Sequence, residues 1–368
     1  MKPTVLQILP ELDCGGVERG TLDIAKELVK RGHRSIVVSG LGRLVPQLVA
    51  EGSEHFNLPV GKKSLFTAPT LIPKLYNLFK DQKIDVIHAR SRLPAWLAYL
   101  AWKRLDPKKR PAFITTVHGP YSVNRYSKIM TAGERIIAIS EYIKNYILEN
   151  YPAVDEKNIE IVHRGISKDE YLYDYKPTDD WLNNWKTQYP ELNNKFIVTL
   201  PGRITRWKGH NDFIDIITAA RKSGLNVHGV IAGGADTNKK NYLQELKSII
   251  KQNNMQDHFT FIGHRDDMKS VMAASNIVLS LAKIPEAFGR TALEALFLGV
   301  PVIAYDHGGA AEVLGQLFPE GKAEPLNIDD VVSLLTEFHS TMPVVPDLSH
   351  FTLDEMLDKT ISIYNSFS

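Results

Sequence analysis

Cysteine is almost missing from this sequence, and its scarcity excludes several kinds of protein. Cys14 is the only cysteine among the 368 residues. No disulfide can form within the chain, which is typical of a reducing compartment, so we expect a cytoplasmic protein. A metal site built from several cysteines is excluded for the same reason.

Long apolar runs are missing as well. Nowhere do about 18 uncharged apolar residues follow one another, which is the length that a membrane-spanning helix needs. The first residues, Met1–Val5, lead straight into a short strand-like segment that is too short for a signal peptide. With 43% hydrophobic and 23% charged residues, the sequence predicts a soluble globular protein that is long enough for two domains.

Several common ligand motifs are absent. The loop after the first expected strand lacks the Gly-x-Gly-x-x-Gly pattern and the Lys-Ser/Thr of a P-loop, and Val37–Ser39 ends the second strand without an acid. These absences count against a nicotinamide oxidoreductase, which is otherwise an alternative for a chain of this kind. The sequence also has no His-Glu-x-x-His and no Asp-x-Asp pattern, so we expect no metal ion.

The net charge of +2 is unevenly distributed. Residues 1–165 carry 25 Lys and Arg against 16 Asp and Glu, a net charge of +9, and the rest of the chain carries −7. A basic first half predicts an anionic partner, such as a phosphorylated glycolipid, a membrane surface or a nucleic acid. A solvated basic surface without such a partner is the alternative.

Short β-branched strands alternate with helical patterns along the sequence. The strands are apolar on both sides, which is typical of parallel strands that helices cover on either face. We expect them at residues 5–9, 35–39, 86–87, 113–117, 136–139 and 160–162, and again at 195–200, 227–232, 259–262, 277–281 and 302–305. Two such series predict an α/β protein with two tandem doubly wound, Rossmann-like domains.

The domain boundary is expected where this alternation stops. Residues 167–194 are rich in Tyr, Asp, Asn, Pro and Trp and show no persistent period of 2 or 3.6 residues. We therefore expect an N-terminal domain over residues 1–168 and a C-terminal domain over 169–349. Apolar residues at helical spacing predict a final helix, within 350–368, that packs on one of the two domains.

Two glutamates are the most informative feature of the sequence. Seven residues separate Glu286 from Glu294, and Gly289 lies between them, where we expect a loop to become a helix. The second carboxylate then lies inside the helix and can accept two hydrogen bonds from a ribose diol. The loop amides and the helix N-terminus form a site for anions and hydroxyls. The alternative is a helix start enriched in acids, which stabilise the helix dipole.

A basic loop precedes this motif in the chain. Arg203 and Lys208 lie between Gly202 and Gly209, after an expected strand and before a helix that begins near His210. The planar fork of Arg203 and the point charge of Lys208 suit the oxygens of a diphosphate. A solvated basic loop is the alternative.

Smaller motifs end other strands. Gly15 and Gly16 follow the first strand, and His118 follows the strand at 113–117, at the edge where ligands bind in open α/β sheets. The His118 ring can donate a hydrogen bond to a sugar hydroxyl or to a developing phosphate charge. Further glycine-containing strand ends occur at Gly233–Gly234, Ile262–His264 and Gly308–Gly309. Each is an ordinary turn when taken alone, and together they leave space for a nucleotide.

In this order, the motifs resemble those of retaining glycosyltransferases of family four, which have the GT-B fold. The resemblance covers nearly the whole chain and rests on Gly15–Glu18, His118–Gly119, Gly202–Gly209, Glu286–Glu294 and Gly308–Gly309. Within the family, Thr116–Tyr121 and His163–Ile166 resemble bacterial lipopolysaccharide-core transferases, including mannosyltransferases. The chain departs from the family at Arg290, where many relatives have an apolar residue, and at His163–Arg164, where an asparagine is common.

The resemblance implies a role for each motif in the second half. Arg203 and Lys208 would bind the donor diphosphate and stabilise it as it leaves, and Glu294 would hold the ribose hydroxyls. Glu286 would lie near the transferred sugar. The amides of Ala287, Phe288 and Gly289 would hold the hydroxyls of that sugar.

In the first half, the resemblance implies that His118 contacts the sugar or the phosphate next to it. Gly15 and Gly16 would let their loop approach the donor phosphates and the acceptor. Catalysis in this family requires both domains to close on the donor.

The resemblance thus implies a metal-independent enzyme that transfers a hexose, with retention, from GDP-mannose or a UDP-sugar. The acceptor would be a lipopolysaccharide-core or other glycan or glycolipid, and this acceptor, not a nucleic acid, would be the anionic partner of the basic half. Residues 93–110 predict peripheral contact with the cytoplasmic face of the inner membrane, unless they form a core helix with a solvated end. The alternatives are a nucleotide-sugar epimerase or hydrolase, and a non-catalytic nucleotide-sugar-binding subunit.

Overall fold

The protein consists of two compact units, as seen in a computed structural model that describes residues 2–13, 15–63, 68–234 and 240–367. The first unit comprises Met1–His163 together with Asp354–Ser368, and the second comprises Arg164–Leu353. The chain therefore builds most of the first unit, then all of the second, and returns to the first with its final helix.

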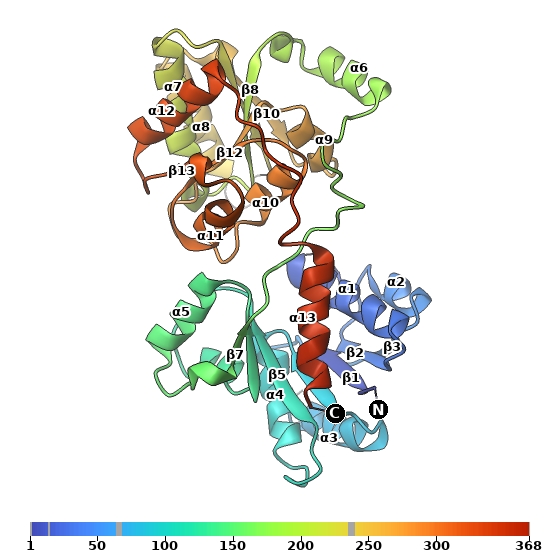
Figure 1. The fold of residues 1–368 in the computed structure, drawn as a ribbon. Helices are drawn as coiled ribbons and strands as arrows, with labels where there is room; N and C mark the ends of the chain where they lie inside the picture. The colour runs from blue at the N-terminus through green and yellow to red at the C-terminus, as the bar shows by residue number, and fades with distance from the viewer. Residues whose placement is uncertain (1, 14, 64–67, 235–239, 368) are drawn as a thin grey trace. The chain divides into compact units, whose positions relative to one another are not determined.

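The first unit is built on a parallel sheet with the strand order β3-β2-β1-β4-β5-β6-β7 (Figure 1). The strands are β1 (Val5–Ile8), β2 (Ser35–Ser39), β3 (Glu54–Asn57), β4 (Val86–Ala89), β5 (Ala112–Val117), β6 (Arg135–Ala138) and β7 (Ile159–Ile161). The helices are α1 (Gly16–Lys30), α2 (Val45–Ala50), α3 (Ala68–Asp81), α4 (Arg92–Trp102), α5 (Glu141–Asn150) and α13 (Leu353–Asn365). Every residue of β1, β2, β4 and β5 is buried, as expected for parallel strands between helical layers.

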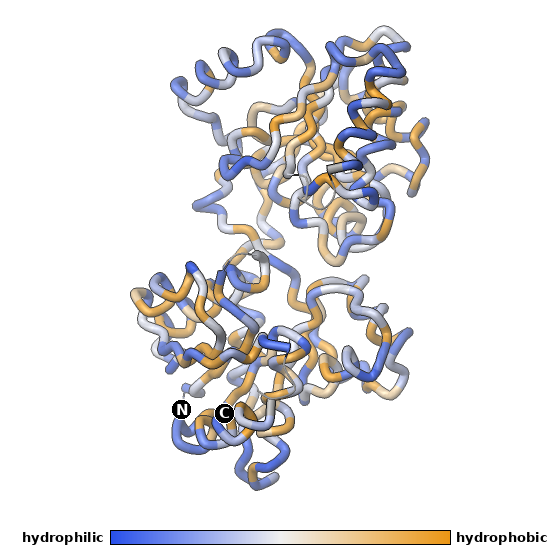
Figure 2. The backbone as a smooth tube through the Cα atoms, turned by 180° about the vertical axis from the view of Figure 1, so that it is seen from behind, coloured by the Kyte–Doolittle hydropathy of each residue, from blue (hydrophilic) through white to orange (hydrophobic). Residues whose placement is uncertain are grey.

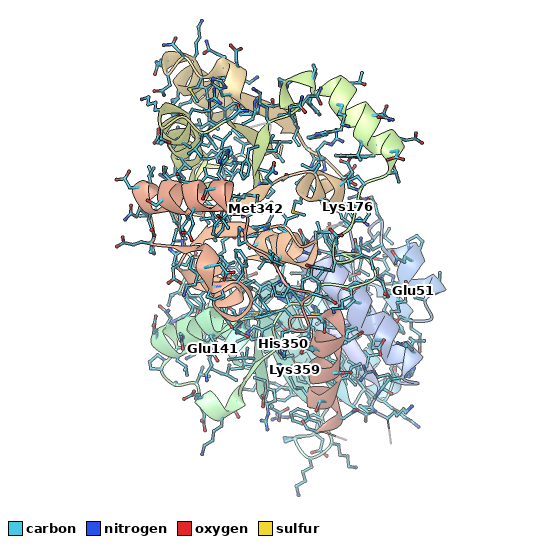
Figure 3. All side chains as sticks on the ribbon, turned by 45° about the horizontal axis from the view of Figure 1, so that its top comes forward. Glu51, Glu141, Lys176, Met342, His350 and Lys359 are labelled. Carbon is cyan, nitrogen blue, oxygen red and sulfur yellow. The ribbon has the colours of Figure 1, made fainter. Side chains whose placement is uncertain are left out.

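Helix α13 packs on the first unit through one apolar face. The buried residues of this face are Met356, Leu357, Thr360, Ile361 and Tyr364. The Tyr364 hydroxyl lies 2.6 Å from Nδ1 of His88 in β4, and Arg31 at the end of α1 pairs with Asp358. Lys359 lies on the exposed face of the same helix (Figure 3).

The second unit repeats this plan with the strand order β10-β9-β8-β11-β12-β13, again all parallel. The strands are β8 (Phe196–Pro201), β9 (Val227–Ala232), β10 (Phe259–Gly263), β11 (Ile277–Ser280), β12 (Val302–Tyr305) and β13 (Lys322–Ala323). The helices are α6 (Asp179–Gln188), α7 (His210–Lys222), α8 (Lys240–Gln252), α9 (Met268–Ala273), α10 (Arg290–Phe297), α11 (Gly308–Leu317) and α12 (Ile328–Ser340). In each unit the apolar segments gather in the interior strands, and the helices are mixed in character (Figure 2).

Both sheets reverse their strand order next to the first strand of the unit. β1 pairs with β2 on one side and β4 on the other, and β8 pairs likewise with β9 and β11. The loops that leave two such neighbours diverge, and the crevice between them at the carboxyl edge is where ligands bind in open α/β sheets. In the second unit these loops follow β8 and β11.

The two doubly wound sheets confirm the predicted fold class, but three elements are absent from the sequence-based expectations. Strand β3 lies at an edge of its sheet and is half exposed, so it lacks an apolar pattern, and β13 has only two residues. Helix α6 lies inside the stretch 167–194 that was expected to be irregular. Thr178 caps this helix by accepting a hydrogen bond from the Trp181 amide, and two acids occupy its first turn, a start signal that the sequence does contain.

The basic stretch at residues 93–110 is a core helix with a solvated end. Leu97, Ala98 and Trp102 of α4 are buried, and the Trp102 indole donates to the Pro111 carbonyl at 2.7 Å. The guanidinium of Arg110 lies 3.5 Å from the centre of the Trp102 ring. Within the described ranges, no helix combines the length and the apolar character that crossing a bilayer requires.

Candidate functional site

The second unit places its two charged motifs on the neighbouring loops that leave β8 and β11. We call residues 202–209 the Lys208 loop and residues 281–289 the Glu286 loop. Because β8 and β11 are paired, with Val198 opposite Ile277 in the register, the two loops begin side by side at the carboxyl edge of the sheet. This is the switch point of the second unit, and the site is therefore located where the fold favours ligand binding.

Glycines shape the Lys208 loop and bring it close to its neighbours. Gly209 caps α7 with a positive φ of 78°, and a Cβ added there would lie 1.9 Å from the Leu281 carbonyl oxygen. A Cβ on Gly233, after β9, would lie 1.9 Å from the Gly202 carbonyl oxygen. The Lys208 loop is thus packed between the loops that follow β9 and β11, with no space for a side chain at either contact.

The Glu286 loop turns into α10 at Gly289, as the sequence predicts. Gly289 has a positive φ of 76° and caps the helix that begins at Arg290. Glu286 therefore lies on the loop, and Glu294 lies about one turn inside α10. The Glu294 side chain is 15% exposed, and its Oε1 accepts a hydrogen bond from Nε of Arg290 at 2.7 Å.

The start of α11 supports the backbone of the Glu286 loop. The Gly309 amide donates to the Glu286 carbonyl at 2.7 Å. A Cβ on Gly309 would lie 2.2 Å from Cα of Phe288, and one on Gly308 would lie 2.8 Å from the Glu286 nitrogen. This contact explains why two glycines follow β12 at this point. The Phe288 side chain itself is buried, and the centres of its ring and the Phe351 ring are 6.0 Å apart. Only the backbone of Phe288 is therefore expected to face a ligand.

The main electrostatic feature of the site is an ion pair between the two loops. The ammonium of Lys208 contacts Oε1 of Glu286, and the two side chains are 20% and 12% exposed. Lys208 also lies 4.6 Å from the centre of the Trp207 ring. Arg203 is exposed, and within the described residues its side chain makes no hydrogen bond or ion pair. The site therefore combines a paired lysine with an arginine fork that is open to a ligand.

Tyr171 is a site residue that the sequence analysis did not single out. Burial raises the pKa of its hydroxyl well above the ordinary value, and the nearby Glu294 carboxylate raises it further. Tyr171 thus remains a neutral hydrogen-bond donor next to the carboxylate that we expect to hold a ribose. No local motif marks this tyrosine, because its contact depends on how residues 164–174 pack on α10.

The first unit carries the remaining predicted residues at the carboxyl edge of its own sheet. Gly15 has a positive φ of 132° and caps α1 without a side-chain hydrogen bond, and Gly16 is the first residue of that helix. Cys14, in the same loop, lies outside the described residues. His118 directly follows β5 and is partly buried, and its amide donates to the Tyr121 hydroxyl at 3.3 Å.

A metal ion would be bound by several side chains that lie close together. Among the described residues, no group of three or more His, Cys, Asp or Glu residues is arranged so that it could hold an ion. The charged groups that the site does offer are the guanidinium of Arg203, the ammonium of Lys208 and the carboxylates of Glu286 and Glu294. Such a set suits a ligand that has both anionic oxygens and hydroxyl groups.

Two protein families match this chain, one in each half. The family described as Glycosyltransferase Family 4 matches residues 14–170, and the family described as Glycosyl transferases group 1 matches residues 183–340. The second match contains both loops of the site in the second unit. The first contains Gly15, Gly16 and His118.

Solved structures are similar to this chain over its whole length. A glycosyltransferase from Rickettsia africae ESF-5 is 29% identical with a TM-score of 0.86, and the match covers 100% of this chain and 98% of that one. Anabaena HepE in complex with UDP and glucose is 20% identical with a TM-score of 0.72, over 99% and 95% of the two chains. The lipopolysaccharide outer core galactosyltransferase WaaB is 15% identical with a TM-score of 0.71, over 99% and 98%. The last two similarities show the fold alone.

Among curated relatives, Spore coat protein SA of Bacillus subtilis is 26% identical over 254 residues. This match spans 64% of the present chain and 63% of that protein, which is less than two thirds of the relative's length.

Proposed function

The chain belongs to the glycosyltransferases that join a family 4 domain to a group 1 domain on the GT-B fold, and we propose that it transfers a hexose from a nucleotide diphosphate sugar, with retention and without a metal, to a glycan or glycolipid acceptor. The observation that carries the proposal is the pairing of the Lys208 and Glu286 loops at the switch point of the second unit. GDP-mannose and UDP-sugars are the candidate donors. A lipopolysaccharide core is the candidate acceptor, and the fold shared with WaaB is consistent with this choice.

Donor binding follows from the chemistry of the two loops. The diphosphate carries two or more negative charges, and we assign them to the Arg203 fork, the Lys208 ammonium and the N-terminus of α10. The Glu294 carboxylate accepts hydrogen bonds from the ribose hydroxyls. The amides of Ala287 to Gly289 hold the sugar next to Glu286.

The reaction breaks the bond between the sugar C1 and the phosphate oxygen, and charge builds on the diphosphate. Arg203 and Lys208 stabilise that charge in the transition state more than in the bound donor, which is what accelerates the step. The acceptor hydroxyl attacks C1 from the face that the diphosphate leaves, and its proton passes to the departing phosphate oxygen. His118 contacts the sugar or the adjacent phosphate. The products are the glycosylated acceptor and a nucleoside diphosphate.

The acceptor is assigned to the first unit because residues 1–165 carry the excess of positive charge. We propose in addition a peripheral contact with the cytoplasmic face of an anionic membrane through Lys103, Lys108 and Lys109, beyond α4. Because most apolar residues of α4 are buried and Leu100 is the large aliphatic side chain that is exposed, at 41%, we propose a contact that is mainly electrostatic. The basic end of α4 precedes β5, whereas His118 follows it, so the length of one strand, about 20 Å, separates the two.

The transfer reaction is tested first with a donor screen. Thermal shifts with UDP, GDP and ADP identify the nucleotide, because a ligand of the folded state raises the melting temperature. Transfer of sugar from the matching donor is then measured for the wild type, K208M and E286Q. We expect each variant to lose about 100-fold or more in kcat. The exposed Lys168–Asp347 pair of the same unit lies outside both loops and gives the matched controls K168M and D347N, which should retain turnover.

Four results would contradict the proposal. Turnover at the wild-type level in both K208M and E286Q would remove the assigned site. Release of free sugar with no glycosylated product would indicate a hydrolase, and conversion of one donor sugar into another would indicate an epimerase. Binding of a nucleotide sugar without any reaction would indicate a binding subunit.

Membrane contact is tested separately, by co-sedimentation with phosphatidylglycerol vesicles. We expect binding at low salt that is lost at about 0.5 M salt, because screening weakens a purely electrostatic contact. K108E/K109E should bind less than the wild type, and the matched double reversal K222E/K251E in the second unit should not. Equal binding of the two double variants would remove residues 103–109 as the contact.

A further inference from the structure

A second ion pair joins the Glu286 loop to the start of α7, directly after the Lys208 loop, and in this pair the signs of the charges are reversed. Oδ1 of Asp212, in the first turn of α7, lies 2.6 Å from the ammonium of Lys283 on the Glu286 loop. We call the contact between residues 202–212 and the Glu286 loop the loop junction. Lys208 and Asp212 lie on one side of it, and Glu286 and Lys283 lie on the other. Each side carries one cation and one anion, and the two pairs cross the same junction.

The second pair is anchored by a tyrosine. Asp212 is 6% exposed, and its Oδ2 accepts a hydrogen bond from the Tyr305 hydroxyl at 2.9 Å. Tyr305 ends β12 and is 1% exposed, and burial raises the pKa of its hydroxyl well above the ordinary value, so it stays a donor. Both oxygens of the Asp212 carboxylate are therefore bound. A buried carboxylate with two partners is costly to displace, since removing either partner leaves a desolvated charge.

Backbone contacts reinforce the same junction. The Lys283 amide donates to the Trp207 carbonyl at 2.7 Å, directly before Lys208. The Gly209 backbone lies so close to Leu281 that no side chain fits between them. These contacts therefore fix the separation of the two loops at the C-terminal end of the Lys208 loop, independently of the Lys208–Glu286 pair.

We propose that Asp212, Lys283 and Tyr305 are positioning residues that hold the Glu286 loop in register while Lys208 exchanges its partner. This inference rests on the proposed function. A donor diphosphate competes with Glu286 for the Lys208 ammonium, and binding of the diphosphate breaks the first ion pair. The Asp212–Lys283 pair then remains as the charged link between the loops. It keeps the Glu286 carboxylate and the loop amides next to the sugar when Lys208 has turned to the phosphate.

This role predicts a particular division of effects. Arg203 and Lys208 both lie on the Lys208 loop, and α10 with Glu294 is held by its own buried face. Loss of the Asp212–Lys283 pair should therefore leave nucleoside diphosphate binding almost unchanged. The sugar should be held less accurately next to the Glu286 carboxylate, and the reaction should slow, because small displacements of reacting groups lower the rate. We therefore expect a fall in kcat at a nearly constant dissociation constant for the nucleoside diphosphate.

The experiment compares D212N, K283M, D212N/K283M and Y305F with the wild type. For each protein, kcat, the donor KM, the dissociation constant of the nucleoside diphosphate and the melting temperature are measured. We expect kcat to fall about 10- to 100-fold in the two single variants, and the dissociation constant to change less than about 3-fold. The double variant should be no worse than the poorer single variant, because both remove one interaction. K283R keeps the charge and should retain most of the turnover.

The matched control is another lysine–aspartate pair of the same unit. Lys168 and Asp347 are 3.1 Å apart and exposed, and K168M and D347N should match the wild type in every measurement. Wild-type turnover in both D212N and K283M would overturn the positioning role, and so would losses that multiply in the double variant. Loss of nucleotide binding and melting temperature in parallel with kcat would show a purely structural role. If the wild type itself transfers no sugar from any donor, the proposed function fails, and the positioning role fails with it.

Discussion

The ammonium of Lys208 is paired with the carboxylate of Glu286, although 78 positions separate the two residues in the chain. Each group is the main counter-charge of the other, and both are largely screened from water by the surrounding loops. A diphosphate that binds Lys208 must therefore replace Glu286 as its partner. The affinity of the site for a nucleotide is then a difference between two interactions of the same lysine.

E286Q should bind UDP or GDP more tightly than the wild type, even though it is expected to lose turnover. The amide cannot compete for the Lys208 ammonium as the carboxylate does, so the diphosphate meets an unpaired cation. We expect the dissociation constant to fall about 3- to 10-fold, measured by isothermal titration calorimetry. E245Q removes the acid of the neighbouring Arg206 pair and should bind like the wild type. Unchanged or weaker binding in E286Q would show that the Lys208–Glu286 pair does not oppose the donor.

Gly209 should be intolerant of alanine because of a contact and not only because of its backbone conformation. In G209A the new Cβ would overlap the Leu281 carbonyl, and this overlap would push the Lys208 and Glu286 loops apart. Gly224 also has a positive φ, of 95°, but no atom lies within 4 Å of an added Cβ. We expect G224A to cost about 1–2 kcal/mol of unfolding free energy from backbone strain. G209A should cost more and weaken nucleotide binding, as urea unfolding and calorimetry would show, and equal effects of the two would refute the contact.

The loop-to-helix transition at Gly289 and all strands except β3 and β13 could be predicted from the sequence, because they depend on local information. Glycine tolerates a positive φ, and short apolar β-branched runs identify buried parallel strands wherever they occur. The predicted strand at 227–232 agrees with β9 at both ends. The matches to the two glycosyltransferase families confirm the resemblance that the motifs indicated.

The residues that hold the two site loops in place could not be predicted, because their roles depend on tertiary contacts. In the sequence, the three positioning residues look like an acid at a helix start (Asp212), a loop lysine (Lys283) and a strand end (Tyr305). Only the folded sheet brings them together. Tyr171 lies in a stretch without periodicity, and its packing beside Glu294 has no local signature. Strand β3 escapes prediction for a different reason, since its exposure at the edge of the sheet removes the apolar pattern that identifies buried strands.

His228 should make the protein less stable in acid. Thr260 donates its hydroxyl proton to Glu191 at 2.8 Å, so Nε2 of His228, 2.9 Å from the same oxygen, carries a proton. The buried Nδ1 has no hydrogen-bond partner among the residues that the structure describes. Burial lowers the pKa of His228 to about 4, below the usual value of about 6.5. The unfolded chain therefore takes up a proton first, and stability is lost as the pH falls from about 6.5 towards 4.

H228Q can preserve the bond to Thr260 without titrating. Its melting temperature should fall less than that of the wild type between pH 7.5 and 5, by about 2–4 °C. His264 is 78% exposed, and H264Q should follow the wild-type pH profile. Parallel profiles for the wild type and H228Q would show that His228 is not the group responsible.

Tyr364 should contribute to the stability of the first unit through its hydroxyl. Y364F keeps the ring but removes the 2.6 Å hydrogen bond to the buried His88 ring. Loss of a buried hydrogen bond costs about 1–3 kcal/mol, so we expect the melting temperature to fall by roughly 3–8 °C. Y126F, at a tyrosine that is 40% exposed, is the control and should melt like the wild type. A Y364F protein that melts like Y126F would show that apolar packing alone holds α13 in place.

The order in which the chain is made gives α13 a further consequence. A ribosome releases residues 1–163 long before residues 354–365, yet the latter complete the core of the first unit. The second unit is continuous and can close as soon as it emerges, whereas the first must wait with His88 and its neighbours uncovered. A nonsense mutation anywhere in the second unit therefore damages both units, and a fragment that stops at residue 163 is expected to aggregate unless the final helix is supplied to it as a separate peptide.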